Sequence, residues 1–355
     1  MYRPLALLLA LLLAGCGDDR ETLVIYSPHG KELLGTYERA FEALHPDVDV
    51  QWLDMGSQEA YDRVRTEASN PQASLWWGAP QTMFVRAAEQ DLLEPYRPSW
   101  ADAVPPEARD PQDRWYGQYR TPEVIMYNHD AVDSSAVPAG WDDLLDPRWA
   151  GRVLIRAPLG SGTMRTIFGA MIQRQPSTRD GFRWLARLDQ NTKTYAANPT
   201  QLYLGLARGE GDITLWNLAD AYLQSHDLGY PFSWVLPEEG TPVLVDAVAL
   251  VKGGPNLERA KEFYEFITSD EAVIRQARDF HRLPVRTDIP QDSLPEWMDV
   301  DIRPMPMDWK LLSDSGATWM QYWSEHVQGR GDAFLAANPP PIQPVAPEEE
   351  PAVEE

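Results

Sequence analysis

The loop Gly160-Ser161-Gly162-Thr163 has the residue types that could hold an anion. Glycine lets the backbone come close to a ligand, and the loop precedes a predicted helix that starts at Met164. The free N–H groups and the dipole of a helix N-terminus attract negative charge, and the two hydroxyls add donors. The alternative is an ordinary helix cap, in which a hydroxyl satisfies the first turn. We predict that Ser161, Gly162 and Thr163 contact a ligand.

A second group of candidate contacts follows predicted strands near the N-terminus. The apolar run Leu23–Tyr26 ends in a Ser-Pro-His-Gly turn, where His29 has little core around it. Similar turns follow the strand-like runs that end near Trp52 and Trp77. Each of these residues could instead serve only the turn or the core. The candidate ligand contacts here are Ser27, His29, Gly30, Ser57, Trp77 and Gly78.

The strand-like run that starts at Asp212 ends in two further candidates, Trp216 and Asn217. An indole can stack on a sugar ring or an apolar face while its N–H remains free to donate. Most of the 14 tryptophans must nevertheless lie in the core. Arg120 and Tyr127 lie near a predicted change of lobe, where they either neutralise an anionic ligand or fix the hinge.

Motifs of catalysis and metal binding are absent from the sequence. It has one cysteine, no His-Glu-x-x-His, no Walker loop and no Gly-x-Ser-x-Gly elbow, and its six histidines are scattered. We therefore expect no catalytic residues, no metal site and no cofactor. An enzyme assembled from distant residues, such as a hydrolase of the cell envelope, remains an alternative.

Apolar runs and helical stripes alternate along the chain, which predicts an α/β fold with a parallel sheet covered on both faces. In such sheets ligands lie beyond the carboxyl ends of the strands, where residues 27–30, 56–58 and 78–81 would converge. A second alternating region begins at Val124. The run Val243–Val251 would return the chain to the first region, and a helix over Leu257–Thr268 would pack there.

The N-terminus reads as an export signal. Met1-Tyr2-Arg3 carries positive charge, and Pro4–Ala14 is too short to cross a bilayer, which takes roughly 20 apolar residues. The run ends in Leu13-Ala14-Gly15-Cys16, which resembles a bacterial lipobox. We expect a signal peptide over 1–15, lipid on Cys16, a tether over 16–22 and no internal disulfide. The net charge of -23 argues against nucleic acid or anionic lipid as a partner. The Pro-rich, acidic stretch 339–355 is predicted to be disordered.

Several segments share their order and spacing with a known family. They are Tyr26–Glu32, Trp141–Leu144, Pro147–Arg152, Tyr195–Asn198, Gly209–Asp212, Asp246–Val251 and Arg282–Val285. Together they resemble bacterial periplasmic solute-binding proteins with two crossover strands, in the branch typified by ferric-iron-binding proteins. Asp246, which opens one of these segments, joins the candidate ligand contacts.

The resemblance implies the type II periplasmic-binding-protein fold, with two α/β lobes, two crossover strands and a ligand cleft between the lobes. The first lobe would comprise residues 23–122 with 247–290, and the second 123–246. Residues 291–338 would form a C-terminal helical segment that packs on the lobes.

The iron ligands of that family do not carry over to this sequence. The family has two adjacent tyrosines after the strand that here ends at Trp216-Asn217, where this chain has Ala219-Asp220. The family's glutamate corresponds to about Ala79, and His29 lies one place before the family's histidine. Ferric iron prefers phenolate and carboxylate oxygens, so we expect no iron site.

The resemblance implies the solute-binding lipoprotein of an ABC importer, which hands its solute to a membrane permease driven by ATPase subunits. We expect a monomer in the periplasm, anchored by its lipid, and a small anionic solute. The solute would be a phosphorylated sugar, a phosphoglycerate-like acid or an organophosphonate. The alternatives are a ferric-iron-binding protein and a ligand-sensing module for a membrane receptor.

The lipid anchor gives the first testable prediction. Replacing Cys16 by serine removes the only thiol that can receive lipid, so Cys16→Ser should move the protein from the membrane fraction to the soluble fraction. Fractionation with radiolabelled palmitate measures both effects. A wild-type protein that is already soluble and unlabelled would contradict the prediction.

Overall fold

The computed structural model describes residues 20–340. The predicted signal peptide, the lipid site at Cys16 and the tail beyond residue 340 lie outside the described residues. No helix of the described part is both long and apolar enough to span a membrane.

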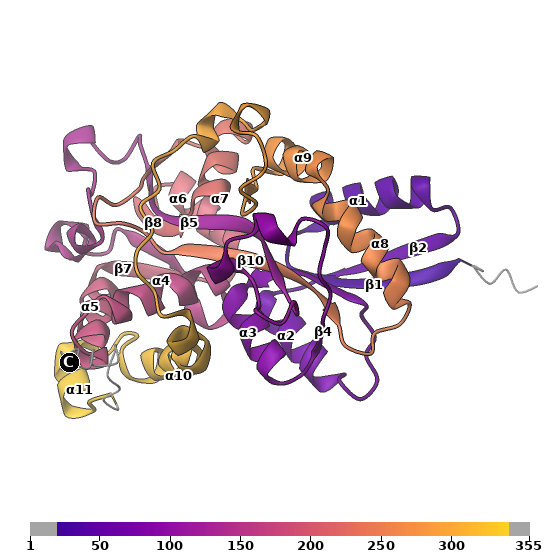
Figure 1. The fold of residues 1–355 in the computed structure, drawn as a ribbon. Helices are drawn as coiled ribbons and strands as arrows, with labels where there is room; N and C mark the ends of the chain where they lie inside the picture. The colour runs from indigo at the N-terminus through magenta and orange to yellow at the C-terminus, as the bar shows by residue number, and fades with distance from the viewer. Residues whose placement is uncertain (1–19, 341–355) are drawn as a thin grey trace, which may run out of the picture.

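Eleven strands of the described chain form one mixed sheet, in the order β2-β1-β3-β10-β5-β8-β6-β7, with β4, β9 and β11 paired beside this path. Figure 1 shows how the sheet continues through both halves of the molecule. The strands are β1 (Glu21–Ser27), β2 (Val48–Asp54), β3 (Leu75–Pro80), β4 (Leu93–Glu94), β5 (Tyr116–Asn128), β6 (Val153–Arg156), β7 (Thr192–Ala196), β8 (Ile213–Asn217), β9 (Phe232–Val235), β10 (Val243–Val251) and β11 (Leu283–Pro284).

The α-helices of the described chain lie on both faces of this sheet. They are α1 (Lys31–Leu44), α2 (Ser57–Thr66), α3 (Gln81–Glu89), α4 (Gly162–Gln173), α5 (Thr178–Asn191), α6 (Pro199–Ala207), α7 (Leu218–Tyr222), α8 (Leu257–Thr268), α9 (Asp270–Phe280), α10 (Trp309–His326) and α11 (Gly331–Ala337). Strand alternation explains the two-sided cover in the first half. Leu23 and Ile25 of β1 pack with α1 and α8, whereas Tyr26 packs with α2 and α3 on the other face.

The predicted α/β alternation is confirmed, but the sheet is not parallel throughout. β1 runs parallel to β2 and β3, as predicted. β10 runs antiparallel to both of its long neighbours, β3 and β5. The reason is that β5 leaves the first half and β10 returns to it, so these two adjacent strands must point in opposite directions.

The two halves are joined where β5 changes its partners. β5 pairs with β10 over Tyr116–Pro122 and with β8 over Glu123–Tyr127. The last pair between β5 and β10 is Pro122 with Val243. These two strands are therefore the crossovers between the halves, and a hinge motion would bend them.

The chain after β11 crosses the molecule as an extended segment and ends in α10 and α11 (Figure 1). Helix α10 contacts both halves. On one side the Ser313 hydroxyl donates to the Thr82 carbonyl at 2.8 Å, and Lys310 pairs with Glu89 of α3 at 2.8 Å. On the other side Leu312 packs closely on Gly169 of α4, where an added Cβ would overlap it.

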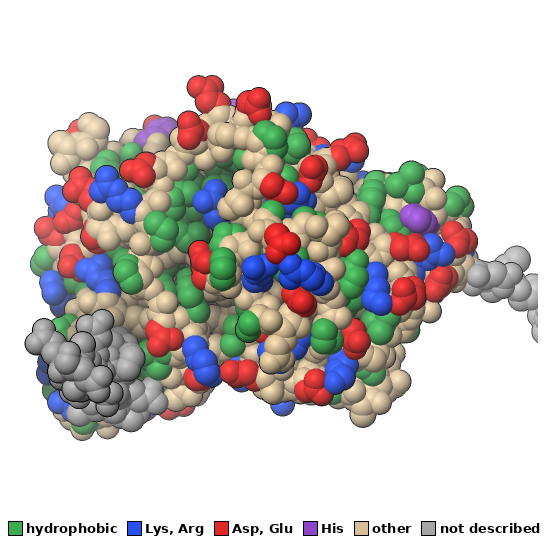
Figure 2. All heavy atoms as spheres, viewed as in Figure 1, with side chains coloured by type: hydrophobic (Ala, Val, Ile, Leu, Met, Phe, Trp, Pro, Cys, Tyr) green, Lys and Arg blue, Asp and Glu red, His purple; other side chains and the backbone are tan. Residues whose placement is uncertain are grey.

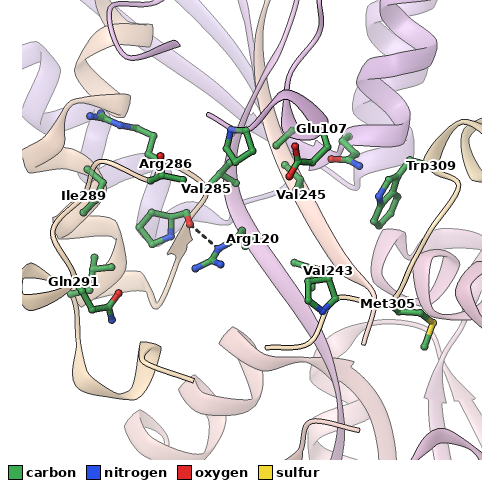
Figure 3. A pocket seen from close by; sticks show the side chains of 17 residues that line it. Glu107, Arg120, Val243, Val245, Val285, Arg286, Ile289, Gln291, Met305 and Trp309 are labelled. Carbon is green, nitrogen blue, oxygen red and sulfur yellow. Dashed lines mark hydrogen bonds between the residues drawn. The ribbon is translucent and has the colours of Figure 1, made fainter. Parts of the chain in front are cut away.

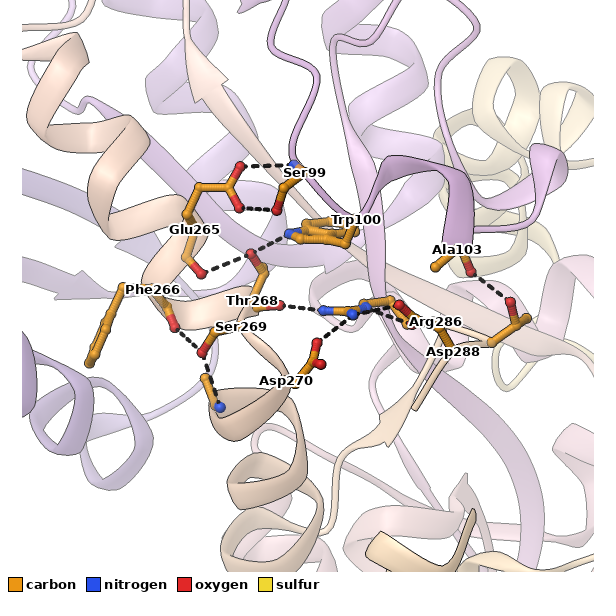
Figure 4. A network of polar contacts seen from close by, with 12 residues as sticks. Ser99, Trp100, Ala103, Glu265, Phe266, Thr268, Ser269, Asp270, Arg286 and Asp288 are labelled. Atoms are coloured by element: carbon orange, nitrogen blue, oxygen red, sulfur yellow. Dashed lines mark hydrogen bonds and ion pairs between the residues drawn. The ribbon is translucent and has the colours of Figure 1, made fainter. Parts of the chain in front are cut away.

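A buried arginine ties this crossing segment to the first half (Figure 4). The Arg286 guanidinium donates to Asp270 at 2.5 Å, to Asp288 at 2.7 and 2.9 Å, and to the Thr268 carbonyl at 2.8 Å. The Thr268 hydroxyl in turn accepts the indole N–H of Trp100 at 2.8 Å. Several charge-assisted bonds on one guanidinium hold the start of the segment against the junction of α8 and α9.

Glu123 is fully buried at the point where β5 passes from β10 to β8. Neither carboxyl oxygen has a hydrogen-bond partner among the described residues. Burial, followed by repulsion from Asp246 and Asp220, raises the pKa of Glu123 well above its usual range. The folded protein therefore holds this side chain as a neutral acid over a range of pH in which the unfolded chain ionises it.

This pKa difference predicts how stability depends on pH. Above the ordinary pKa of glutamic acid the unfolded state loses the proton first, so Glu123 costs stability that grows with pH up to its folded pKa. Glu123→Gln should therefore raise the melting temperature at pH 7, by about 2 °C or more. The gain should shrink as the pH falls toward about 4.5, the ordinary pKa of glutamic acid, where the unfolded chain keeps about half of this proton.

Differential scanning calorimetry from pH 4.5 to pH 7.5 measures this effect. Glu296→Gln serves as the control because Glu296 is exposed, and it should show no such trend. A Glu123→Gln protein that melts below the wild type at pH 7 would contradict a neutral, unpaired Glu123.

Candidate functional site

A cavity of about 160 Å³ lies between the two halves, on one face of the crossover strands. This is roughly the volume that five molecules of liquid water occupy, so it suits a small solute. Of the residues predicted from the sequence, those that line it are His29, Ser57, Gly162, Thr163, Asn217 and Asp246. The other lining residues are Pro28, Pro80, Thr121, Asp220, Leu244 and Arg282.

The β1–α1 turn places His29 in the cavity wall. The Ser27 hydroxyl accepts the His29 backbone N–H at 3.2 Å. The imidazole packs on Gly78, which has a φ of 93° and where a Cβ would overlap the ring. Burial, followed by the charge of Arg282, lowers the pKa of His29 well below its usual range. His29 is therefore neutral at physiological pH.

Several predicted contacts support the cleft without lining it. Trp77 is fully buried, its indole N–H donates to Gln118 at 2.6 Å, and its ring lies edge-on to His29 at 5.7 Å. Gly30 has a φ of 81° and precedes α1, so it serves the turn. Ser27 and Gly78 position His29, as described above.

The loop before α4 both caps the helix and contributes to the cavity wall. The Ser161 hydroxyl accepts the Met164 backbone N–H at 3.2 Å, so Ser161 is the helix cap. Gly162 and Thr163 line the cavity at the N-terminus of α4, a helix of 12 residues. Gly162 also faces the first half, because an added Cβ would lie 2.7 Å from Cγ of Pro80.

Asp220 is the most firmly held acid of the cleft. One of its oxygens accepts from the Tyr203 hydroxyl at 3.1 Å, and from Trp216 Nε1 and Asn217 Nδ2 at 3.0 Å each. Trp216 does not line the cavity, since its indole N–H is used to position Asp220. Asn217 lines the cavity and also caps α7, with its oxygen accepting the Asp220 N–H at 2.8 Å.

Asp246 and Arg282 bring opposite charges to the same cavity. The Thr121 hydroxyl donates to Asp246 at 3.0 Å. Burial raises the pKa of Asp246, although the positive charge of Arg282 and the Thr121 bond act to lower it. Arg282 lies over the ring of Tyr119 at 5.9 Å, and its Nε has no hydrogen-bond partner in the described part of the chain.

This arrangement suits a solute with one anionic group and at least one polar or cationic group. Arg282, the N-terminus of α4 and the Thr163 hydroxyl can donate hydrogen bonds to an oxyanion. Asp220 and Asp246 can accept from hydroxyl or ammonium groups. No cluster of three or more His, Cys, Asp or Glu suited to a metal occurs within residues 20–340, and no tyrosine lines the cavity.

Thr121, Asp220 and Arg282 were not among the contacts predicted from the sequence. Thr121 adjoins Arg120, and only the register of β5 shows that Thr121 is the one that faces the cleft. Asp220 occupies a position where the family that the sequence resembles has an iron ligand. Arg282 lies in a segment that resembles the family, and the turn after α9 brings it to the cleft.

Comparison with known proteins places the chain among transport proteins. A family described as "Bacterial extracellular solute-binding protein" matches residues 80–304. The chain is 27% identical over 311 residues to a "Probable ABC transporter periplasmic-binding protein" of Sinorhizobium fredii, covering 85% of each chain. It is 26% identical over 298 residues to a "Putative 2-aminoethylphosphonate-binding periplasmic protein" of Salmonella typhimurium, covering 80% of this chain and 85% of the relative.

A further relative is the "Iron uptake protein A1" of Synechocystis, 24% identical over 302 residues, with 79% of this chain and 83% of the relative covered. Among solved structures, the periplasmic binding protein AfuA of Actinobacillus pleuropneumoniae, with fructose 6-phosphate bound, superposes with a TM-score of 0.75. It is 24% identical and covers 87% of this chain and 99% of its own. The likeness extends to the whole two-part architecture. The chain belongs to the bacterial extracellular solute-binding protein family, and its fold is the type II fold of periplasmic binding proteins.

Proposed function

We propose that this ABC-type solute-binding protein captures a small phosphate or phosphonate ester or acid that also carries hydroxyl or amino groups. The observation that carries the proposal is the position of Arg282. Its guanidinium has no carboxylate within ion-pair distance among the described residues, and it shares a small cavity with the N-terminus of α4. A phosphoryl group would supply the missing counter-charge and accept from both.

The two acids of the cavity narrow the class of solute. Asp220 and Asp246 would repel a plain polyanion but accept from sugar hydroxyls or from an ammonium group. A phosphorylated sugar and an aminoalkyl phosphonate both combine such groups with a phosphoryl group. The named ligands of two similar proteins, 2-aminoethylphosphonate and fructose 6-phosphate, belong to these classes.

Ferric iron remains the second candidate because relatives include an iron uptake protein. The residues that line the cavity offer carboxylates and one neutral imidazole, but no phenolate. Such a set is a weaker match for ferric iron than for a phosphorylated solute.

Delivery to the membrane would follow the scheme of ABC importers. The halves on either side of the crossovers would act as lobes that close on the solute by bending β5 and β10. The closed protein would then dock on a permease whose ATPase subunits are separate chains. Anchoring at Cys16, a monomeric state and a role in import in preference to sensing stay predictions.

Removing the charge of Arg282 tests the proposed phosphoryl site. Hydrogen bonds to charged groups contribute about 1.5–3 kcal/mol each, so Arg282→Met should weaken binding of the solute by about 10-fold to 100-fold or more. Isothermal titration calorimetry with 2-aminoethylphosphonate, fructose 6-phosphate, 3-phosphoglycerate and ferric citrate provides the measurement. Mass spectrometry of solute that co-purifies with the native protein identifies the physiological one.

The control for this variant is Arg187→Met, which removes an exposed arginine of α5 and should bind like the wild type. If ferric citrate alone binds, or if Arg282→Met binds a phosphorylated solute as tightly as the wild type, the proposal of a phosphoryl site at Arg282 is wrong.

Gly162 tests whether the α4 N-terminus approaches the solute and the first half. An added side chain would collide with Pro80 and fill the cavity, so Gly162→Val should reduce affinity for every solute by about 10-fold or more, whatever its charge. Gly160→Val is the matched control, since Gly160 lies outside the cavity and its added Cβ would meet only the flexible Arg156 side chain. Equal affinities in the two variants would mean that the loop does not touch the solute.

A further inference from the structure

A larger cavity, of about 510 Å³, lies on the opposite face of the crossover strands from the cleft (Figure 3). Successive side chains of a strand point to opposite faces. On β10, Val245 lines the larger cavity and Asp246 lines the cleft. On β5, Arg120 lines the larger cavity and Thr121 lines the cleft. One pair of strands therefore separates two cavities.

The wall of this back cavity is mainly apolar and comes from separate parts of the chain. The crossover strands form one side, and the residues around Ala108 in the first half form another. The segment after β11 closes it with Val285, Ile289 and Met305. Trp309, the first residue of α10, also faces the open space in Figure 3. Such a wall suits the apolar body of a small molecule.

Arg120 brings a single uncompensated positive charge into this apolar surface. Its Nε donates to the Pro284 carbonyl at 3.0 Å, and no acid pairs with it among the described residues. The guanidinium is open to the cavity, yet burial lowers the pKa of Arg120. Arg286, which also lines the cavity, is by contrast paired with Asp270 and Asp288.

One acid, Glu107, lies at the cavity wall across from Arg120 without an ion pair between them (Figure 3). Glu107 is exposed and can be solvated by water. An arginine in apolar surroundings is stabilised by a planar carboxylate, which its two parallel N–H groups match. The rest of the described wall consists of apolar groups, the neutral side chains of Gln81, Thr287 and Gln291, and Arg286, whose charge is already paired.

We propose that the back cavity is a second ligand site, which takes a small monocarboxylic acid with an apolar body. The carboxylate binds the Arg120 guanidinium, and the body fills the space between the crossover strands and the segment after β11. The proposal is independent of the solute in the cleft, because the two cavities share no lining residue.

Three acids of different shape test the site: octanoate, 3-phenylpropionate and indole-3-acetate, each titrated at pH 7 beside its primary amide. At least one acid should bind the wild-type protein with a Kd below about 1 mM, and its amide should bind about 10-fold or more weakly, a difference of about 1.4 kcal/mol. This comparison needs no variant. The proposal is overturned if no acid binds below about 10 mM, or if acid and amide bind alike.

Variants then locate the binding. Arg120→Met replaces the guanidinium by an apolar side chain of similar length, so it should weaken binding of the acid by about 10-fold or more. Glu107→Gln removes a like charge from the same cavity and should leave binding unchanged or tighter, and Arg187→Met is the surface control. Thr163→Val changes a side chain that lines only the front cleft, so this variant should still bind the acid. Binding that survives Arg120→Met, or is lost in Thr163→Val, would place the acid elsewhere and refute the site.

Discussion

The antiparallel pairing of β5 with β10 is the constraint on which the rest of the structure depends. In the first half, β10 also pairs with β3. In the second half, β5 pairs with β8. β5 continues from its pairing with β10 into its pairing with β8, so the strand itself joins the halves, and any motion between them must bend it. The alternation of side chains along the same strands gives one face to the cleft and the other to the back cavity.

The second feature that shapes the cleft is its balance of charge. Glu123 is buried and Asp246 is half-buried near Asp220, and among the described residues Arg282 is the one cation that lines this cavity. Burial raises the pKa of Asp246 and of Glu123. This favours their neutral forms and so lowers the repulsion between them. Asp220 is instead held by three donors. The site thus separates an acceptor region from a donor region, and this favours a solute that carries both kinds of group.

The C-terminal part of the chain links the halves by a second route. Arg286 fixes the crossing segment to the first half, and α10 contacts α3 on one side and α4 on the other. The ion pair of Lys310 with Glu89 is solvent-exposed, so it is worth little energetically. Ser313 and Leu312 are buried and make the tighter contacts. Charged side chains of both signs intermingle over the face of the molecule seen in Figure 2.

The sequence by itself determined the elements and most of the loops that reach the cleft. Apolar runs and helical stripes predicted β1–β3, α1 and the exact span of α8, because periodicity is a local property. The rule that ligands lie beyond strand ends found His29 and Ser57, since loop positions follow from the order of elements. The glycines and hydroxyls before a predicted helix pointed to Gly162 and Thr163.

Only the tertiary structure decided which side chains face the cleft. Trp77 and Trp216 were both predicted at strand ends as ligand contacts, but both use their indole N–H within the protein. That of Trp77 donates to Gln118, which is distant in sequence, and that of Trp216 donates to Asp220 of α7, directly after β8. Arg282 reaches the cleft because α9 and the turn after it carry it there, and Thr121 does so because of the register of β5 with β10. Register and long-range packing are set by contacts between distant residues, which no local pattern records.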